Sequence, residues 1–475
     1  MKLFNTRTHE IEDFKTLDDS QTVRVYSCGP TVYNHAHIGN LSAYVFADML
    51  RRALRLAGYQ INHVMNFTDV DDKTIRDSAI KYPDMAPEAA LAKLTHHYET
   101  IFLDEMTEIG NDTAALTFVR ATESIEGMKG LIRRLVEQGV AYLADDGIYF
   151  SIAEYQRTRR YGQLSHIELT NKTRSRIDND EYDKDSAQDF ALWKKQKSGE
   201  PAWDFDLTGL VSGSISADFR GRPGWHIECS VMSASKLGQP FDIHTGGIDL
   251  IFPHHENEIA QSTAGDQPEL YANFFIHNEH LLVDGVKMAK SKHNFYTLVD
   301  IKNQGFDPLD FRMLILQSHY QSPSNFSWEN LTAARNRRRN WHSKAELRWQ
   351  IEDSHDDGQT EIVNNLLDKA KNALEDNLDT PNTLRYIDEA FDQFIYENVS
   401  HFALDNVLRF IDESLGLTIQ SMTPDITAIE KGQIAQRQMA KQERDFDKSD
   451  RIRDALLVNG LQLNDLADRT IWNRL

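Results

Sequence analysis

The feature that most constrains the fold is a strand, a turn and a helix within residues 22–58. Residues 22–26 alternate β-branched and other side chains, which predicts a strand, and residues 41–56 carry apolar side chains at helical spacing. Gly58 follows as a helix stop. The turn between them, 28–40, contains Cys28, His37 and Gly39. This order predicts an open α/β sheet, in which ligands bind where strands end and helices begin.

The rest of the chain alternates strands and helices and then becomes helical. The expected elements are a strand at 61–67, helices at 87–109 and 122–139, a hairpin at 141–150, strands at 241–244 and 280–283, and amphipathic helices near 361–376, 383–399 and 402–415. The charged, turn-rich segment 151–222 separates two halves of one sheet, so we interpret it as an insertion. The final helices predict a bundle.

Composition excludes several classes of protein. The chain has 475 residues, a net charge of −21 and two cysteines, Cys28 and Cys229. So few cysteines exclude a secreted disulfide scaffold and favour the cytoplasm. No apolar run approaches the roughly 18 residues of a membrane span, and the first residues lack the apolar core of a signal peptide. The negative average argues against nucleic acid as a partner, unless a local basic surface is present.

Polar and aromatic side chains crowd two later stretches, 224–230 and 254–258. His254 and Glu258 are four residues apart, so on a helix they share one face. Two distant cysteines are more often buried apolar side chains than metal ligands. Trp225 is likewise consistent with core packing or with a pocket wall.

Two motifs resemble the signatures of class I aminoacyl-tRNA synthetases. Residues 37–40, HIGN, resemble the first signature, and residues 287–291, KMAKS, resemble the second. With GWHIEC at 224–229 and HHENE at 254–258, the resemblance narrows to the bacterial-type cysteinyl-tRNA synthetase family. It covers nearly the whole chain, including NFTD at 66–69, DTP at 379–381 and DFDKSD at 445–450.

This resemblance implies a domain organisation. The fold class is α/β, with a Rossmann-like catalytic domain over 1–335. That domain comprises sheet halves at about 20–110 and 223–300, an inserted connective region at about 111–222 and a stem-contact region at about 300–335. A helical bundle (336–425) and an anticodon-binding region (426–475) follow. Basic residues of the last region either contact tRNA or form a salt-bridged face, and Trp472 is interpreted as a stacking platform.

The resemblance also implies one zinc ion per subunit, with a cysteine pocket beside it. The implied zinc ligands are Cys28, Cys229, His254 and Glu258. The implied contacts to the substrate cysteine are Gly29, Thr68 and Trp225. Zinc is borderline soft, so the substrate's own sulfur can join it, whereas the hydroxyl of serine is a poor ligand.

The implied second substrate is ATP with Mg²⁺. The implied ATP-binding residues are Pro30, His37, Gly39, Asn40, Gly246, Gly247, Asp249, Lys287, Lys290 and Ser291. Among these, the implied catalytic residues are His37, Asn40, Lys287 and Lys290. We expect the helix start to cradle phosphate and the lysines to close over the departing pyrophosphate.

The implied reaction joins L-cysteine to ATP as cysteinyl-adenylate and then transfers it to the 3′ end of tRNA(Cys), on a monomeric enzyme. Asn40 departs from the signature, which has a second histidine there. Asparagine donates a hydrogen bond but carries no charge, which bears on the adenylation rate.

The sequence is also consistent with two other functions. A mycothiol-type ligase gives adenylated cysteine to an amino-sugar, but such a small acceptor needs neither the helical region nor the basic tail. A non-catalytic tRNA-binding paralogue is favoured by Asn40 and disfavoured by the four metal ligands and the two lysines.

Overall fold

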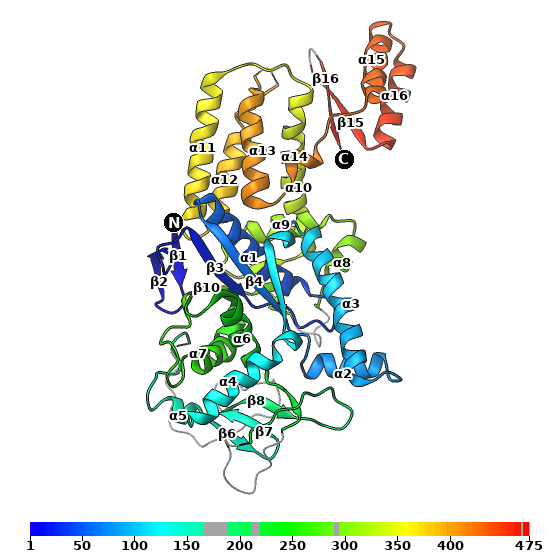
Figure 1. The fold of residues 1–475 in the computed structure, drawn as a ribbon. Helices are drawn as coiled ribbons and strands as arrows, with labels where there is room; N and C mark the ends of the chain where they lie inside the picture. Colours follow the sequence, from blue (N-terminus) through cyan, green and yellow to red (C-terminus); the bar gives the residue numbers. More distant parts are fainter. Residues whose placement is uncertain are drawn as a thin grey trace. The chain divides into compact units, whose positions relative to one another are not determined.

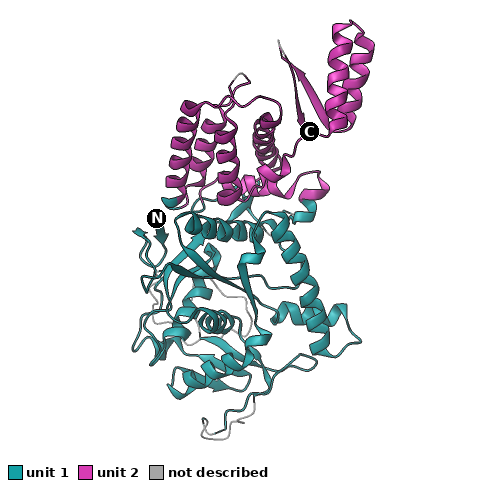
Figure 2. Ribbon diagram, turned by 45° about the horizontal axis from the view of Figure 1, so that its top comes forward, with its two compact units in different colours: residues 1–300, 320–325, 375–377 teal, residues 301–319, 326–374, 378–475 magenta. Residues whose placement is uncertain are grey.

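The structure is a computed structural model that describes residues 1–165, 189–208, 210, 219–288, 294–396, 398–466 and 469–474. The chain divides into two compact units (Figure 2). The first comprises residues 1–300, 320–325 and 375–377, and the second comprises 301–319, 326–374 and 378–475. Among the described residues, every helix is too short or too polar to cross a bilayer.

A five-stranded parallel sheet forms the centre of the first unit (Figure 1). Its strands are β3 (Thr22–Ser27), β4 (Gln60–Phe67), β5 (Leu116–Arg120), β10 (Phe241–Gly247) and β11 (Ala272–Asn278). Their order is β11-β10-β3-β4-β5, so the chain starts in the middle, runs outward to β5 and returns beside β3. This is the strand order of a Rossmann fold, with its switch point between β3 and β10. The predicted α/β class is confirmed.

Both faces of this sheet are buried. Tyr26 of β3 and Val64 of β4 pack in one apolar cluster with α4 (Ile125–Glu137) and α6 (Trp225–Leu237). The neighbouring residues on those strands, Val25 before Tyr26 and Met65 after Val64, are also buried and point to the opposite face. Helix α1 (Ile38–Leu56) connects β3 to β4 and begins at Ile38, with His37 as its N-cap, earlier than the predicted residue 41.

The sequence prediction missed two strands of the sheet. β5 lies in a segment read as the loop between two helices, and β11 lies between the strands expected at 241–244 and 280–283. β5 has five residues at the sheet edge. β11 is an almost continuously buried run, ANFFIHN, without the alternation that marks a strand with one exposed face.

An antiparallel sheet of order β6-β7-β8-β9 is inserted between β5 and β10 in the chain. Its strands are β6 (Ala141–Ala144), β7 (Gly147–Phe150), β8 (Phe190–Lys195) and β9 (Gly221–Pro223). β6 and β7 form the predicted hairpin. Phe150, Phe190 and Trp193 join the apolar cluster under α6, which ties this sheet to the central one.

The first unit has further short strands and helices. They are β1 (Lys2–Asn5), β2 (Glu10–Asp13), α2 (Asp72–Lys81), α3 (Pro87–Glu108), α5 (Ile152–Tyr155), α7 (Glu256–Thr263), β12 (Leu281–Val283) and β13 (Val286–Lys287). Three elements, α8 (Leu298–Asn303), β14 (Ser324–Phe326) and α11 (Asp357–Glu375), each include a position where the chain passes from one unit to the other.

The second unit is helical and ends in a β-hairpin. Its elements are α9 (Pro308–Leu316), α10 (Trp328–Ala345), α11 (Asp357–Glu375), α12 (Thr380–Phe391), α13 (His401–Leu415), α14 (Ile419–Met422), α15 (Ala428–Gln442), α16 (Phe446–Val458), β15 (Leu461–Asp465) and β16 (Thr470–Arg474). The three amphipathic segments are helices, as predicted, although α12 ends at Phe391 rather than 399. Gly416 ends α13 in the left-handed conformation, with φ 64°.

The interpretation of Trp472 as a stacking platform is wrong. Its side chain is buried and packs with Ile426, Leu456 and Leu461. The basic residues nearby are largely ion-paired. Arg437 binds both carboxylate oxygens of Asp465 at 2.8 Å.

Candidate active site and metal centre

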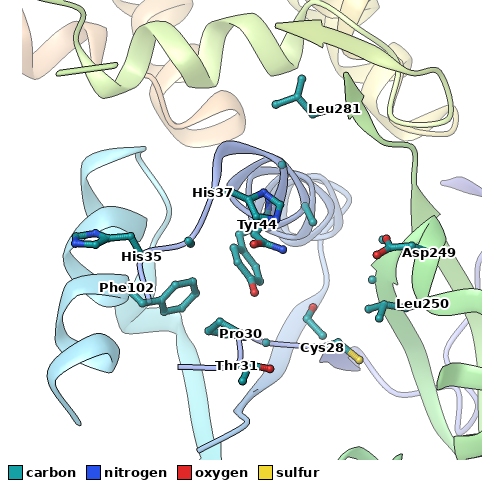
Figure 3. A pocket seen from close by; sticks show the side chains of 18 of the residues that line it. Cys28, Pro30, Thr31, His35, His37, Tyr44, Phe102, Asp249, Leu250 and Leu281 are labelled. Atoms are coloured by element: carbon teal, nitrogen blue, oxygen red, sulfur yellow. The ribbon is translucent and has the colours of Figure 1, made fainter. Parts of the chain in front are cut away.

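A cavity of about 500 Å³ opens where β3 and β10 end, at the switch point of the sheet (Figure 3). The turn after β3, the start of α1, helix α3 and the end of β10 line it. In Figure 3, Cys28, Pro30 and Thr31 form one wall, His37 lies just before α1 and Tyr44 on it, and Asp249 lies beyond the end of β10. The strand–turn–helix motif therefore lies where the sequence predicted a ligand site.

Four predicted metal ligands converge at one end of this cavity. Cys28 directly follows β3, Cys229 lies on α6, and Glu258 lies in the first turn of α7. The two sulfurs are 3.9 Å apart, and Oε1 of Glu258 is 3.9 Å from the Cys28 sulfur. With a nitrogen of His254, all four ligand atoms lie within 4.8 Å of one another.

His254 reaches this cluster from an unexpected element. It was expected on a helix with Glu258, but it lies in the turn Ile251–His255, where Phe252 has non-helical backbone angles, just before α7. Its Nε2 is nevertheless 3.0 Å from Oε1 of Glu258. Its Nδ1 is 2.9 Å from Nδ1 of His226, and its ring stacks on Trp225 with centroids 4.1 Å apart.

The carboxylate of Glu258 is fixed by two donors on its other oxygen. His244 Nε2 and the Tyr271 hydroxyl each donate to Oε2 at 2.8 Å. All three side chains are completely or almost completely buried. Although burial opposes it, the neighbouring histidines hold the pKa of Glu258 well below its usual value. The group is therefore an anion with Oε1 turned toward Cys28 and His254.

The charges of the cluster favour a cation. The hydrogen bond with Cys28 lowers the pKa of the Cys229 thiol to about 6. Burial lowers the pKa of His254, but Glu258 and Cys229 raise it to about 10, because anionic groups attract positive charge. Two sulfurs, an imidazole nitrogen and a carboxylate oxygen are donors that tetrahedral zinc takes in proteins. The residues present therefore fit zinc.

A second set of ligand atoms overlaps the first and was missed by sequence reasoning. Cys28, His244, His255 and Glu258 also converge within 4.8 Å, with His255 Nε2 3.3 Å from the Cys28 sulfur. His255 Nδ1, however, already pairs with His277 at 2.7 Å, and His244 is bonded to Glu258. The set with two thiols is softer and suits zinc better. In the sequence, the adjacent histidines His254 and His255 were the one sign that a second histidine could approach the metal ligands.

The predicted ATP residues lie along the same cavity. His37 caps α1, with its Nδ1 accepting from the Asn40 N–H at 3.1 Å. A Cβ on Gly39 would lie 2.3 Å from the Met288 side chain, so this position accepts no larger residue without a shift. The other predicted residues that line the cavity are Pro30, Asn40, Gly246, Gly247, Asp249 and Lys287. Lys290 and Ser291 lie outside the described residues.

Of the three residues predicted to contact the substrate cysteine, two line the cavity and the third lies behind its wall. Gly29 and Trp225 line the cavity. A Cβ on Gly29 would lie 1.7 Å from the Asn66 carbonyl oxygen, so only glycine fits. Thr68 is buried behind this turn, and its hydroxyl donates to Glu228 Oε2 at 3.0 Å. Its main-chain N–H donates to the Pro30 carbonyl at 3.0 Å, and its carbonyl accepts from the Val32 N–H at 3.2 Å. It supports the wall and is not among the residues that line the cavity.

Sequence reasoning also missed the wall that α3 contributes. Tyr98, Phe102 and Glu105 line the cavity together with His35. Glu105 Oε1 lies 2.9 Å from His35 Nδ1, and burial raises the pKa of Glu105 although His35 opposes this. The two residues are 70 positions apart, and no local pattern connects them.

Comparison with known proteins agrees with this geometry. Residues 14–336 match the family model of the tRNA synthetases class I (C) catalytic domain. A cysteine–tRNA ligase of Leptospira interrogans is 37% identical, and one of Solibacter usitatus is 39% identical. Each alignment covers 100% of this chain and 99% of the relative.

Solved structures with low sequence identity share the fold. A Mycobacterium tuberculosis methionyl-tRNA synthetase in complex with methionyl-adenylate superposes with a TM-score of 0.55 at 13% identity. The superposition covers 85% of this chain and 89% of that one. By the full-length similarity of its sequence, this chain belongs to the cysteine–tRNA ligase family of class I tRNA synthetases.

Proposed function

We propose that this protein activates L-cysteine with ATP and transfers it to the 3′ end of tRNA(Cys). The observation that carries the proposal is the position of the Cys28, Cys229, His254 and Glu258 cluster, which borders the cavity that the start of α1 also lines. A site that recognises sulfur therefore adjoins a site suited to phosphate. The full-length relatives named cysteine–tRNA ligase support it.

Cys28, Cys229, His254 and Glu258 would hold the zinc ion, which would supply a Lewis acid able to take a further thiolate. Three of the ligands are buried, whereas Cys28 is partly exposed at the cavity. A substrate sulfur would therefore approach the cluster from the side of Cys28. Trp225, which stacks on His254, would form the adjacent wall of the amino-acid pocket. Serine would fit by shape, but its hydroxyl is a poor ligand.

The remaining residues position the substrates for two steps. In the first, a carboxylate oxygen of cysteine attacks the α-phosphorus of ATP, and the bond to pyrophosphate breaks. In the second, a ribose hydroxyl of tRNA attacks the acyl carbon, AMP leaves, and the hydroxyl proton is released. The start of α1 with His37, and Lys287 and Lys290 of the second motif, would stabilise the phosphate charges, with Mg²⁺ on ATP.

The domain roles follow the family resemblance. We propose the catalytic domain over 1–335, the helical bundle over 336–425 and anticodon contacts within 426–475. Residues 300–335 would contact the acceptor stem of tRNA. The monomeric state and the cytoplasmic location stay predictions.

Two assays test this function. Cysteine-dependent exchange of pyrophosphate into ATP, with little exchange for serine, is the expected first result. Charging of tRNA(Cys), without transfer to glucosaminyl-inositol, is the expected second result. Exchange without tRNA charging would favour the amino-sugar ligase, and tRNA binding without exchange would favour a non-catalytic paralogue.

A further inference from the structure

One wall of the active-site cavity has no role in the proposed chemistry. In Figure 3, His35 and Phe102 lie on the side of α3, and Asp249 and Leu250 lie on the opposite side, beyond β10. The residues proposed for ATP come from the start of α1, the end of β10 and the second motif, and those for cysteine lie near Cys28. None of them belongs to α3.

Helix α3 presents a face suited to an aromatic ring. Tyr98 and Phe102 are four residues apart, and Glu105 is three further on, so their side chains share one face of the helix. All three line the cavity. The His35 ring meets Tyr98 edge to face, with centroids 6.0 Å apart. Phe102 is 3% exposed and its ring packs edge to face with Tyr44 and Phe67, so the half-buried Tyr98 is the ring that can stack on a base, whatever the base.

Glu105 adds an acceptor to this face. Its side chain is 6% exposed, and Oε1 is 2.9 Å from His35 Nδ1. Its other oxygen, Oε2, is buried without a hydrogen-bond partner in the part of the chain that the structure describes. A buried carboxylate oxygen without a donor is costly, so a ligand that brings an N–H or O–H is favoured. The same negative charge repels a phosphate.

A cation lies at the rim of the same cavity. Lys73, in the first turn of α2, lines the cavity and is exposed, with its Nζ 5.8 Å from the ring centroid of Tyr33. The wall therefore combines the partly exposed ring of Tyr98, an acceptor for N–H or O–H groups and a positive charge at its edge. A nucleoside with a phosphate directed toward the rim of the cavity matches these groups: its base can stack, its N–H or O–H groups can donate to Glu105, and its phosphate can meet Lys73.

We propose that the α3 wall binds the 3′-terminal adenosine of tRNA, with Glu105 accepting from the nucleoside and Lys73 meeting its phosphate. The inference rests on the proposed function, because transfer requires a ribose hydroxyl to reach an acyl group while AMP still occupies its own side of the cavity. His35 is a positioning residue, which orients the carboxylate of Glu105.

The test separates the two steps of the reaction. Glu105→Gln and Tyr98→Leu are compared with Asp104→Asn, which changes an exposed carboxylate on the same helix. Pyrophosphate exchange reports the first step. Single-turnover transfer from enzyme-bound cysteinyl-adenylate reports the second. Binding is measured for tRNA(Cys) with and without its terminal adenosine.

For both test variants we expect exchange and the KM for ATP to stay within about twofold of the parent protein. Transfer should fall about 10-fold or more, the effect of losing one stacked base or one hydrogen bond to a charged group. The affinity gained from the terminal adenosine should shrink by a similar factor, and Asp104→Asn should change none of these quantities.

Three results with the Glu105→Gln and Tyr98→Leu variants would overturn the proposal. They are equal losses in exchange and transfer, a raised KM for ATP, or a terminal adenosine that increases tRNA affinity as much as in the parent protein. A parent protein without cysteine-dependent exchange would instead contradict the proposed function itself.

Discussion

His244 and Glu258 form a fully buried pair in which His244 Nε2 donates to Glu258 Oε2 at 2.8 Å. This bond, together with that from Tyr271, leaves the opposite oxygen facing Cys28 and His254. Partners outside the ligand set orient metal ligands and are needed for affinity. The parallel strand β10 therefore positions a ligand that lies on α7.

Replacing Tyr271 by phenylalanine tests this support. The change removes one hydroxyl and keeps the buried ring, so Glu258 loses a donor while the packing is retained. We expect zinc affinity to fall about 10- to 100-fold, as for other residues that orient metal ligands. Competition with a chelator of known affinity measures it. Tyr155→Phe removes another buried hydroxyl, bonded to Thr263, and should leave the affinity unchanged.

Replacing Lys290 by alanine tests the second motif. If its charge stabilises the departing pyrophosphate, kcat for pyrophosphate exchange should fall about 10²–10³-fold, by analogy with the loss of one charge-stabilising donor. Lys292→Ala, two positions away and outside the motif, is the control. Equal effects of the two changes would remove Lys290 from the mechanism.

The basic residues of α16 test the proposed anticodon-binding region. Lys448 and Arg451 are exposed. Replacing both by alanine should raise the KM for tRNA and leave pyrophosphate exchange unchanged. Each lost phosphate contact should also reduce, by about one, the slope of the logarithm of the tRNA binding constant against the logarithm of the salt concentration. Lys369→Ala, in the helical bundle, serves as control. A double variant with unchanged binding and slope would place the tRNA elsewhere.

The pair of Arg437 and Asp465 predicts a pH dependence. Hydrogen bonds, first from Arg437 and then from Thr470 and Lys441, hold the pKa of Asp465 well below its usual value. Because the pKa of Asp465 is lower in the folded chain than in the unfolded chain, where it is about 4, the ionised carboxylate stabilises the hairpin above about pH 4. This stabilisation is lost progressively as the pH falls from about 4 toward the folded-state pKa.

Asp465→Asn should therefore speed amide hydrogen exchange in β15 and β16 at pH 7 relative to the parent protein. The difference should shrink below about pH 4, once exchange rates are corrected for pH. Glu443→Gln, an exposed carboxylate, should have no such effect. A difference that persists at low pH would assign the stability to contacts other than this ion pair.

Local patterns predicted much of the fold. The strand before Cys28, the helix after it and the hairpin at 141–150 carry their own signals in alternation, helical spacing and turn residues. β11 did not, because a parallel strand buried on both faces lacks alternation. Trp472 was misread, because its burial depends on residues up to 46 positions away, such as Ile426.

The site was predictable only where a motif marks it. The ligand atoms of Cys28, Cys229, His254 and Glu258 converge as the resemblance implied. Tyr271 and Glu105 carry no motif, because their functions depend on neighbours that only the folded chain brings close. Tyr271 precedes β11 and meets Glu258, and Glu105 on α3 meets His35 in the turn after β3.

The most direct test of the account counts the sulfur atoms bound to zinc. An X-ray absorption spectrum at the zinc edge should show two sulfurs in the purified protein, from Cys28 and Cys229, and three after L-cysteine is added. Serine should leave the count at two. A count that stays at two with cysteine, or a protein that exchanges pyrophosphate normally without zinc, would contradict selection by sulfur coordination.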